Sequence, residues 1–333
     1  MLSQGLPGGS LRGSAASGVC LTARRGARTL AGVTPASPQP VLRQPAPADA
    51  ALLTKQDALI SRLRESRRLI VAYSGGVDSS YLAWAAHRAL GENVLAVTAI
   101  SASFPAHHRA MAEQIVAEFG IPHRFVETDE MTRSAYRKND LDRCYHCKSS
   151  LFERLDGLLD ELDFAAIAYG VNVDDTGDFR PGHRAAAEHR VLSPLLDAGL
   201  GKSEVRVLAE RAGLPCWNTP ASACLASRLP YGTEVTLERL SQVEAGEAAI
   251  RALGFEQVRL RHHGPVARIE LDREVLAAGI PRETREAMAS AIKALGFRYV
   301  CIDLDGYRTG SLNEGQATAS LRRVEGAPDA ARG

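Results

Sequence analysis

The sequence lacks most of the features that would place a chain in a membrane, in a disulfide scaffold or on a nucleic acid. Its 333 residues include only six cysteines and two tryptophans. No run of about 18 uncharged apolar residues occurs that could cross a membrane. The 40 lysines and arginines nearly balance 39 acidic residues, so bulk attraction to nucleic acid is not expected. These absences favour a cytoplasmic globular protein with reduced thiols.

Residues 1–48 lack acidic side chains but contain five arginines among many Gly, Ser, Ala and Pro residues. Such a composition cannot bury enough apolar surface to offset the entropy of ordering. We therefore expect an Arg-rich disordered tail. A transit peptide and an upstream start codon are alternatives that the same composition allows. A second disordered tail is expected at 316–333.

Between these segments, short apolar runs alternate with stretches of helix length. Strands separated by such helices imply right-handed crossovers and a parallel sheet covered on both faces. The sequence thus predicts a doubly wound α/β domain over residues 51–215. Strands are predicted at 69–73, 94–100, 123–127 and 165–169, and helices at 51–66, 79–90, 106–119, 147–162 and 202–212.

From about residue 221 the pattern changes to a mixture of helices and paired strands, which predicts a smaller α+β domain over 221–315. Cys301 falls in the last apolar run and is predicted to be a buried core thiol. The expected helices are 237–253 and 282–295, and the expected strands are 257–263, 267–271 and 298–304.

The first predicted strand runs directly into a loop with two glycines. Glycine lets the backbone approach a ligand closely, and Ser79 is expected to cap the following helix. The N–H groups at that helix start form an anion site at the ligand-binding edge of a parallel sheet. No Lys-Ser or Lys-Thr follows the glycines, so the loop is not of the Walker type. The predicted phosphate-binding residues are Ser74, Gly75, Gly76, Val77, Asp78, Ser79 and Ser80.

Three cysteines carry a second chemical signal. Cys144 and Cys147 form a CxxC pair, which suits a redox dithiol, half a zinc site or part of an iron–sulfur site. A structural zinc site usually needs four protein ligands, and His146 is the competing fourth ligand beside Cys224. Three thiolates on a [4Fe–4S] cluster would leave one iron open to hydrosulfide. The cluster is therefore favoured, and zinc stays an alternative.

Further polar side chains follow the predicted strands. Lys148 is suited to stabilise the charge of a departing phosphate, although an exposed lysine is the plainer interpretation. Arg259 and Arg261 alternate along a predicted strand and so share one face, which suits a phosphate, a subunit contact or simply solvent. Asn172 is predicted to contact ATP. The predicted substrate-binding residues are Asp175, Asp178, Arg180, Arg228, Arg259 and Arg261.

The run SGGVDSS resembles the PP-loop of ATP pyrophosphatases, which implies that it grips pyrophosphate and that Asp78 helps to hold Mg²⁺. The longer motifs are similar to those of the LarE family across residues 51–315. They are RCYHCK, PASACLASRLPYG, Gly170–Gly182 (GxNxDDxxDxRPG), RHHG with ARIE, and GYRTGSLNE.

The resemblance to LarE implies a specific reaction. ATP adenylates a carboxylate of pyridinium-3,5-biscarboxylic acid mononucleotide, and sulfur converts it to a thiocarboxylate on the way to the nickel-pincer cofactor of lactate racemase. In one branch Cys224 gives up its own sulfur and becomes dehydroalanine. In the other, three cysteines hold a [4Fe–4S] cluster, and the presence of Cys144 and Cys147 favours this branch. Cys224, Lys148 and Asp78 would be the catalytic residues.

The family resemblance also implies partners: a carboxylase and a nickel-insertion protein of the same pathway, and further copies of this chain in a homo-oligomer such as a hexamer, built through the C-terminal domain. Three other readings stay open. A PP-loop tRNA thiolase with a three-cysteine cluster would need a basic RNA surface. An amide-forming PP-loop ligase would need an ammonia source and no thiols. A nucleotide-binding module would need no catalysis.

Overall fold

The computed structural model describes residues 47–177, 181–220 and 223–308. Asp178 and Arg180, two of the predicted substrate-binding residues, lie outside this range. So do residues 316–333 and nearly all of 1–48. No helix in the described part of the chain is long and apolar enough to cross a membrane.

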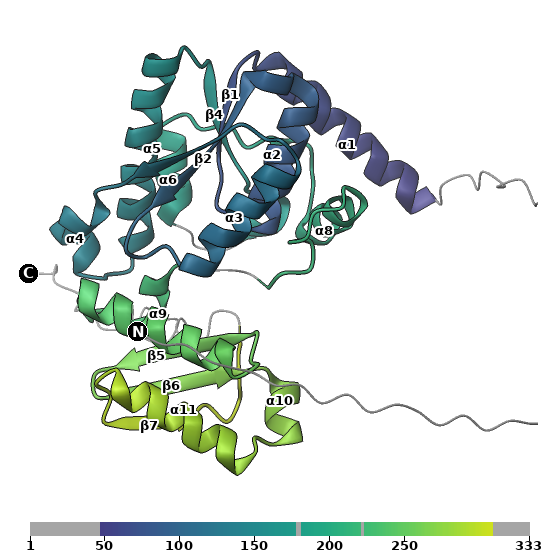
Figure 1. The fold of residues 1–333 in the computed structure, drawn as a ribbon. Coiled ribbons are helices and arrows are strands. Elements are labelled where there is room, and N and C mark those ends of the chain that lie inside the picture. Colours follow the sequence, from purple (N-terminus) through teal and green to yellow (C-terminus); the bar gives the residue numbers. More distant parts are fainter. Residues whose placement is uncertain (1–46, 178–180, 221–222, 309–333) are drawn as a thin grey trace, which may run out of the picture. The chain divides into compact units, whose positions relative to one another are not determined.

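The first half of the described chain is built on a four-stranded parallel sheet with the order β3-β2-β1-β4 (Figure 1). This confirms the predicted α/β fold class. The strands are β1 (Leu69–Ala72), β2 (Val94–Ile100), β3 (His123–Glu127) and β4 (Ala166–Tyr169). The helices are α1 (Pro47–Glu65), α2 (Val77–Leu90), α3 (Ala106–Glu118), α4 (Ser134–Arg137), α5 (Arg143–Leu162), α6 (Pro181–Glu188), α7 (Pro194–Asp197) and α8 (Lys202–Arg211).

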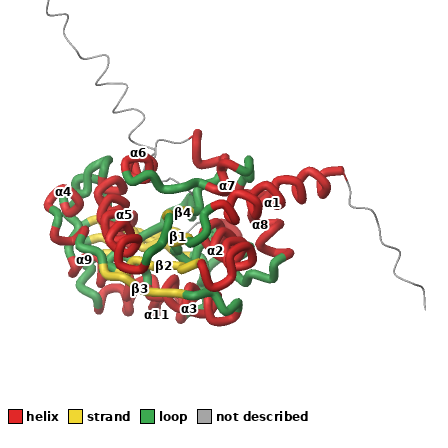
Figure 2. Tube along the Cα trace, turned by 90° about the horizontal axis from the view of Figure 1, so that it is seen from above, coloured by secondary structure: helices red, strands yellow, loops and turns green. Residues whose placement is uncertain are grey.

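Both faces of this sheet are covered, and strand β1 shows why its sequence is apolar throughout. Successive side chains of a strand point to opposite faces. Leu69 and Val71 pack with α1, α2, α3 and α8, whereas Ile70 and Ala72 pack with α5 and α6. Figure 2 shows the strands running between these two groups of helices. A strand buried on both faces cannot alternate apolar with polar residues.

The strand order creates a switch point beside β1. The chain moves from β1 to β2 and β3 on one side and then returns to place β4 on the other. Ligands of open α/β sheets bind in the crevice outside the carboxyl ends of the strands at such a point. Two predicted motifs follow these ends: Ser74–Ser80 comes after β1, and Gly170–Gly182 comes after β4.

The second half forms a three-stranded mixed sheet with helices, as the α+β prediction requires. Strand β5 pairs antiparallel with β6, and β7 pairs parallel with β6. The strands are β5 (Val258–His263), β6 (Val266–Leu271) and β7 (Tyr299–Ile302), and the helices are α9 (Leu237–Ala252), α10 (Arg273–Ala278) and α11 (Arg282–Ala294).

Two expectations about the cysteines are corrected. Cys301 was predicted to be buried but is exposed, because β7 lies at the edge of its sheet and alternate side chains, including Tyr299, face solvent. Helix α5 begins at Arg143 rather than at Cys147. Cys144 is therefore in the first turn of the helix and Cys147 at the start of the second, three residues apart and on neighbouring positions of one face.

Candidate active site

The glycine loop presents the uncapped start of α2. The helix begins at Val77, its N-cap residue is Gly76, and no side chain caps it. The first N–H groups of a helix have no partner within the helix. Together with the helix dipole they attract an anion. The loop therefore has the backbone chemistry that a phosphate needs.

Ser79 does not cap this helix, so that prediction is wrong. It is the third residue of α2, and its hydroxyl donates to the carbonyl oxygen of Gly76 at 3.1 Å. The Ser79 hydroxyl oxygen also accepts the N–H of Ser74 at 3.2 Å and lies 3.0 Å from the Ser74 hydroxyl. Ser79 thus ties the two ends of the loop together and leaves the helix start open.

Two glycines are required by close approach to backbone. Gly75 has φ +75°, and a Cβ there would lie 3.3 Å from the carbonyl oxygen of His108. A Cβ on Gly170 would lie only 2.8 Å from the nitrogen of Ser79 and 2.9 Å from the carbonyl carbon of Asp78. The end of β4 is therefore in contact with the phosphate loop itself. The motif Gly170–Gly182 included this glycine, but its role was not predicted.

Asn172 connects the same two segments. Its side-chain amide donates to Asp78 Oδ1 at 3.2 Å, and both Asn172 and the carboxylate that binds its backbone, Asp175, are buried. Burial raises the pKa of Asp78 and the charge of Asp175 raises it further, while Lys202 and Asn172 lower it. Asp175 thus shapes the loop around Asp78. Its predicted contact with substrate stays a prediction.

The oxygen donors at this point suit a hard cation. Mg²⁺ is usually held by one or two carboxylates together with phosphate oxygens and water. Asp78, with the Asp175 carboxylate near it, supplies the carboxylates, whereas Asn172 faces Asp78 with its amide nitrogen and uses its amide oxygen to accept the N–H of Asp174. No group of three His, Cys, Asp or Glu side chains in the described ranges could hold an ion alone. An ion here would therefore depend on the phosphates of ATP.

Helix α8 brings two cations that sequence reasoning missed. The charges of Lys202 and Arg206 lower the pKa of Asp78 against the effect of burial. The backbone N–H of Lys202 donates to Asp174 Oδ2 at 2.5 Å, which fixes the start of α8 against the loop after β4. Cations are disfavoured in the first turn of a helix. Lys202 at that position was the available signal of a functional role.

The three predicted thiols meet near the start of α5. Cys147 and Cys224, both half-buried, pack against the same apolar core, and Cys144 is exposed beside them. Burial and the neighbouring Cys224 raise the pKa of Cys147 to about 12, with a smaller contribution from Cys144. His146 is hydrogen-bonded to Asp142 at 3.2 Å. No group of three His, Cys, Asp or Glu side chains within the described residues is arranged to hold a metal ion, and this applies to the zinc alternative and to the three-cysteine cluster alike.

Cys224 lies at the same edge of the sheet as the phosphate loop. The N–H of the next residue, Leu225, donates to the carbonyl oxygen of Ser103 at 2.8 Å, in the loop that follows β2. Strand β2 is the neighbour of β1. Arg206 of α8 binds the segment that precedes Cys224 in the chain. It donates to the carbonyl oxygens of Trp217 and Thr219 at 3.1 and 2.8 Å.

Lys148 lies between the CxxC turn and the segment that follows β4. A Cβ on Gly182 would lie 3.0 Å from Lys148 Cγ and 3.7 Å from the Cys144 carbonyl oxygen, so α6 packs closely on the first turn of α5. The Lys148 ammonium is 5.8 Å from the centre of the Phe152 ring. Lys148 is half-buried and lies against Gly182, which belongs to the same motif, Gly170–Gly182, as Asn172.

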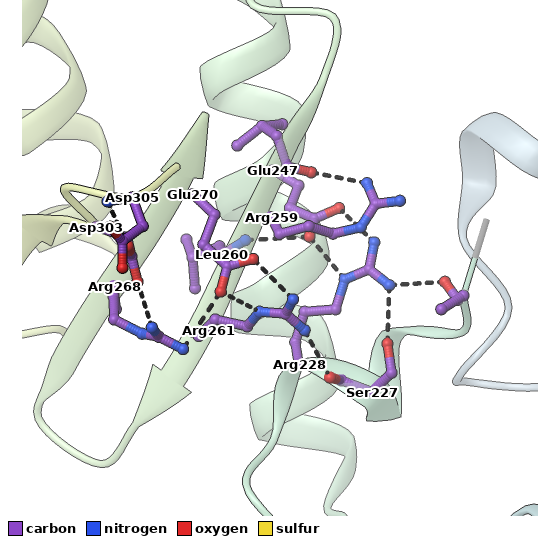
Figure 3. A network of polar contacts seen from close by, with 12 residues as sticks. Ser227, Arg228, Glu247, Arg259, Leu260, Arg261, Arg268, Glu270, Asp303 and Asp305 are labelled. Atoms are coloured by element: carbon purple, nitrogen blue, oxygen red, sulfur yellow. Dashed lines mark hydrogen bonds and ion pairs between the residues drawn. The ribbon is translucent and has the colours of Figure 1, made fainter. Parts of the chain in front are cut away.

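The predicted substrate arginines are buried in a polar network of the C-terminal half (Figure 3). Arg228 makes a bidentate pair with Glu247 at 2.8 and 3.1 Å, and Arg261 makes one with Glu270 at 2.9 and 2.7 Å. Burial, together with the charge of Arg228, lowers the pKa of Arg259 to about 10. Both carboxylate partners, Glu247 and Glu270, are themselves buried.

Three arginines, Arg228, Arg259 and Arg251, lower the pKa of Glu247 against the effect of its burial. Besides Arg228, Arg251 pairs with this carboxylate at 2.8 Å. Two histidines at the start of α3 face the same arginines, and burial and that positive charge lower the pKa of His107 to about 4 and of His108 to about 3. The arrangement suits an anionic ligand. The sequence signal for this group of charges, two adjacent histidines after a predicted strand, was not recognised in the sequence.

Residues 53–138 match the asparagine synthase family. The chain is 36% identical over 273 residues to the pyridinium-3,5-bisthiocarboxylic acid mononucleotide synthase of Lactiplantibacillus plantarum, covering 82% of this chain and 98% of that protein. It is 40% identical over 262 residues to an uncharacterised protein of Synechocystis sp., covering 79% and 98%. It is 27% identical over 263 residues to one of Methanocaldococcus jannaschii, covering 77% and 98%. The chain therefore belongs to the pyridinium-3,5-bisthiocarboxylic acid mononucleotide synthase (LarE) family of ATP-dependent PP-loop proteins.

Proposed function

We propose that this protein is an ATP-dependent sulfur transferase that converts a carboxylate of pyridinium-3,5-biscarboxylic acid mononucleotide to a thiocarboxylate. The observation that carries the proposal is the meeting of two chemistries at one sheet edge. The phosphate loop follows β1, and the hydrogen bond between Leu225 and Ser103 brings Cys224 to the loop after the adjacent strand. The name of the Lactiplantibacillus relative supports this substrate class.

The first half-reaction uses the loop. A substrate carboxylate oxygen attacks the α-phosphorus of ATP, the bond to the bridging oxygen breaks, and pyrophosphate leaves. The N–H groups at the start of α2 and the ammonium of Lys202 stabilise the negative charge that gathers on pyrophosphate. Asp78 would help to hold a Mg²⁺ ion, which would supply positive charge to the phosphates.

The second half-reaction uses the thiol site. A sulfur nucleophile attacks the acyl carbon of the adenylate, and AMP leaves with the electron pair of the broken carbon–oxygen bond. A [4Fe–4S] cluster bound by Cys144, Cys147 and Cys224 would supply an open iron for sulfide. Lys148 is placed to balance the phosphate charge of departing AMP.

The substrate's own phosphate and second carboxylate need positive charge. The arginines around Glu247 would supply it, because Arg228, Arg259 and Arg251 all lower the pKa of this carboxylate against the effect of its burial. The same positive charges would attract an incoming anion. The C-terminal half would thus bind the mononucleotide while the PP-loop half binds ATP.

The test measures both half-reactions separately. The full chain is incubated anaerobically with the pyridinium substrate, Mg-ATP and sulfide, and pyrophosphate and thiocarboxylate are quantified. Cys224→Ala should release pyrophosphate but form no thiocarboxylate, because adenylation needs no thiol. Cys301→Ala, which removes an exposed thiol of the other sheet, should do both. Full activity of Cys224→Ala would instead favour an amide-forming ligase.

The source of the sulfur has its own test. Anaerobic purification with an iron count and an absorption spectrum should reveal bound iron that is lost in Cys144→Ser. An iron-free protein that makes one product molecule per chain and leaves dehydroalanine at position 224 would establish the sacrificial branch instead. Formation of a thionucleoside on added tRNA would instead identify RNA as the substrate.

The proposed reaction also defines partners. A carboxylase must supply the biscarboxylic acid, and a nickel-insertion protein must consume the thiocarboxylate. A homo-oligomer formed through the C-terminal half is part of the same proposal. Light scattering of the purified chain tests it, and a monomeric mass would contradict it.

A further inference from the structure

Every nitrogen of the Arg228 guanidinium donates to a protein group. Its Nε and Nη2 donate to the two carboxylate oxygens of Glu247 at 2.8 and 3.1 Å (Figure 3). Its Nη1 donates to the carbonyl oxygens of Ala223 and Cys224 at 2.6 and 3.0 Å, and to the Ser227 hydroxyl at 3.1 Å. The side chain is 0% exposed. Arg228 can therefore attract a ligand by its charge, but it is not placed to touch one.

The peptide group that joins Cys224 to Leu225 is held at both of its polar atoms. Its oxygen accepts from the Ser227 hydroxyl at 2.7 Å, from the Ser227 N–H at 3.0 Å and from Arg228. Its N–H donates to the carbonyl oxygen of Ser103 at 2.8 Å. Because a peptide group is planar and rigid, holding both atoms restricts the direction in which the Cys224 side chain leaves the backbone.

The two sides of this peptide group are held by different halves of the molecule. Ser103 follows β2 of the parallel sheet, whereas Arg228 is anchored through Glu247 in the C-terminal half. Glu247 is fully buried on α9 and also accepts the N–H of Leu260 in β5 at 3.1 Å. Side chains packed on helices and strands hold a site more precisely than those carried by loops. Cys224 is thus fixed between the half that carries the phosphate loop and the half that carries the arginines.

The residues that follow Cys224 are also fastened by buried side chains. Arg143 donates to the carbonyl oxygen of Ala226 at 2.8 Å and to the Asn139 amide oxygen at 2.6 Å. The Asn139 amide donates to two carbonyl oxygens farther along the same segment, both at 2.8 Å. These bonds join the start of α5, with its CxxC pair, to the segment that carries Cys224.

We propose that Arg228 is a positioning residue: by holding the carbonyl oxygen of Cys224, it keeps the Cys224 side chain in place for sulfur transfer. The inference rests on the proposed function. It applies to both sources of sulfur, because each of them uses Cys224. Arg228 thereby orders the thiol site and does not make the substrate contact that the sequence suggested.

The consequence is a competition between sulfur and water for the acyl-adenylate. When the sulfur nucleophile attacks the acyl carbon, AMP leaves with the electron pair of the broken carbon–oxygen bond and a thiocarboxylate forms. When the sulfur is misplaced, a water molecule attacks the same carbon and gives its proton to solvent, AMP leaves, and the original carboxylate returns. Pyrophosphate has been released in both cases. Misplacement of Cys224 should therefore lower the yield of thiocarboxylate per pyrophosphate.

The test measures thiocarboxylate formed per pyrophosphate released, at saturating substrate, with the full chain under anaerobic conditions. Arg228→Lys keeps the positive charge but loses the fork that spans Glu247 and Cys224, and it should lower this ratio about tenfold. Ser227→Ala removes a second bond to the Cys224 carbonyl oxygen and should lower the ratio about threefold. Arg251→Met is the matched control, because Arg251 pairs with Glu247 from α9. It should raise the KM for the pyridinium substrate and leave the ratio unchanged.

The ratio separates positioning from general stability. If Arg228 only stabilised the fold, its replacement would reduce pyrophosphate and thiocarboxylate together and leave their ratio unchanged, which would overturn the proposal. Ser227 is half-buried, so Ser227→Ala keeps the test available if Arg228→Lys does not fold.

Amide hydrogen exchange separates this inference from the proposed function, because it needs no substrate. Ser227→Ala should speed exchange at the Leu225 N–H severalfold and leave exchange in β7 unchanged. Unchanged exchange at Leu225 would overturn the inference even in an active chain. Faster exchange in a chain that releases no pyrophosphate would instead count against the proposed function alone.

Discussion

The phosphate loop and the thiol site are built in opposite ways. The loop is made within seven consecutive residues, Ser74–Ser80, and binds through backbone N–H groups. The thiol site draws Cys144 and Cys224 from segments about eighty positions apart and depends on buried side chains such as Asn139 and Arg143. A backbone site is set by local conformation, whereas a side-chain site is set by the packing that surrounds it.

The helix starts show the same contrast. Thr236 caps α9 by accepting the N–H of Arg239 at 3.3 Å, and Asp272 caps α10 by accepting that of Glu274 at 3.0 Å. Helix α2 has no such cap after Gly76. These caps stabilise α9 and α10, whereas α11 in the same half begins without a side-chain cap. The start of α2 forgoes this stabilisation and keeps its N–H groups for a ligand.

The largest effect is expected from breaking the buried pair of Arg228 and Glu247. Neither side chain is exposed, so Arg228→Met leaves a buried carboxylate with less compensation. The free energy of unfolding should fall by about 3–5 kcal/mol in urea denaturation. Arg282→Ala, which breaks the exposed pair with Glu286, should cost less than about 1 kcal/mol. Equal losses of unfolding free energy in the two variants would contradict the claim that the buried pair matters more than the exposed one.

The next effect concerns the contact between β4 and the phosphate loop. Gly170→Ala places a methyl group 2.8 Å from the Ser79 nitrogen, so the backbone must shift. We expect a loss of about 1–3 kcal/mol in unfolding free energy and weaker ATP binding by calorimetry. Gly157→Ala is the matched control on α5, with its nearest neighbour at 3.8 Å, and should gain about 0.5–1 kcal/mol. Normal ATP binding by Gly170→Ala would contradict the contact.

A smaller change in stability should accompany a large change in ligand binding at Gly76. This residue has φ −75° and ψ 159°, and a Cβ there meets only Ser74 Oγ at 3.5 Å. Gly76→Asp should cap α2 and raise the unfolding free energy by about 0.3 kcal/mol. Its carboxylate should weaken ATP binding about tenfold or more by repulsion. Gly76→Ala controls for the added carbon, and unchanged ATP affinity in Gly76→Asp would argue against a phosphate site.

The last effect is a dependence of stability on pH. Folding lowers the pKa of His107 to about 4 and of His108 to about 3, from about 6.5 in the unfolded chain. Between about pH 6.5 and 4 the unfolded chain binds more protons, so stability falls as the pH falls through this window. Replacing both residues with Gln should make the slope of unfolding free energy against pH shallower. An unchanged slope would mean that folding does not lower the pKa of these two rings.

The sequence predicted the parts of the fold that depend on local patterns. The four parallel strands and the glycine loop were recognisable because buried strands and helix starts have local composition. The Ser79 cap was wrong, because a serine after two glycines can equally fold back onto them. Cys301 was wrong because an apolar run does not say whether its strand lies at an edge. The carboxylate partners of Arg228 and Arg261 depend on pairing between distant elements, and Arg143 had no local signal at all.

Glu247 links three elements through one carboxylate: it accepts from Arg228 of the 3-10 turn η4 (Leu225–Arg228), from Arg251 of α9 and from the backbone N–H of Leu260 in β5. Substitutions at residues that share a partner are not additive. This makes the network epistatic: a change in one arginine alters the cost of changing the other. Natural variants of this region should therefore substitute several positions together or none.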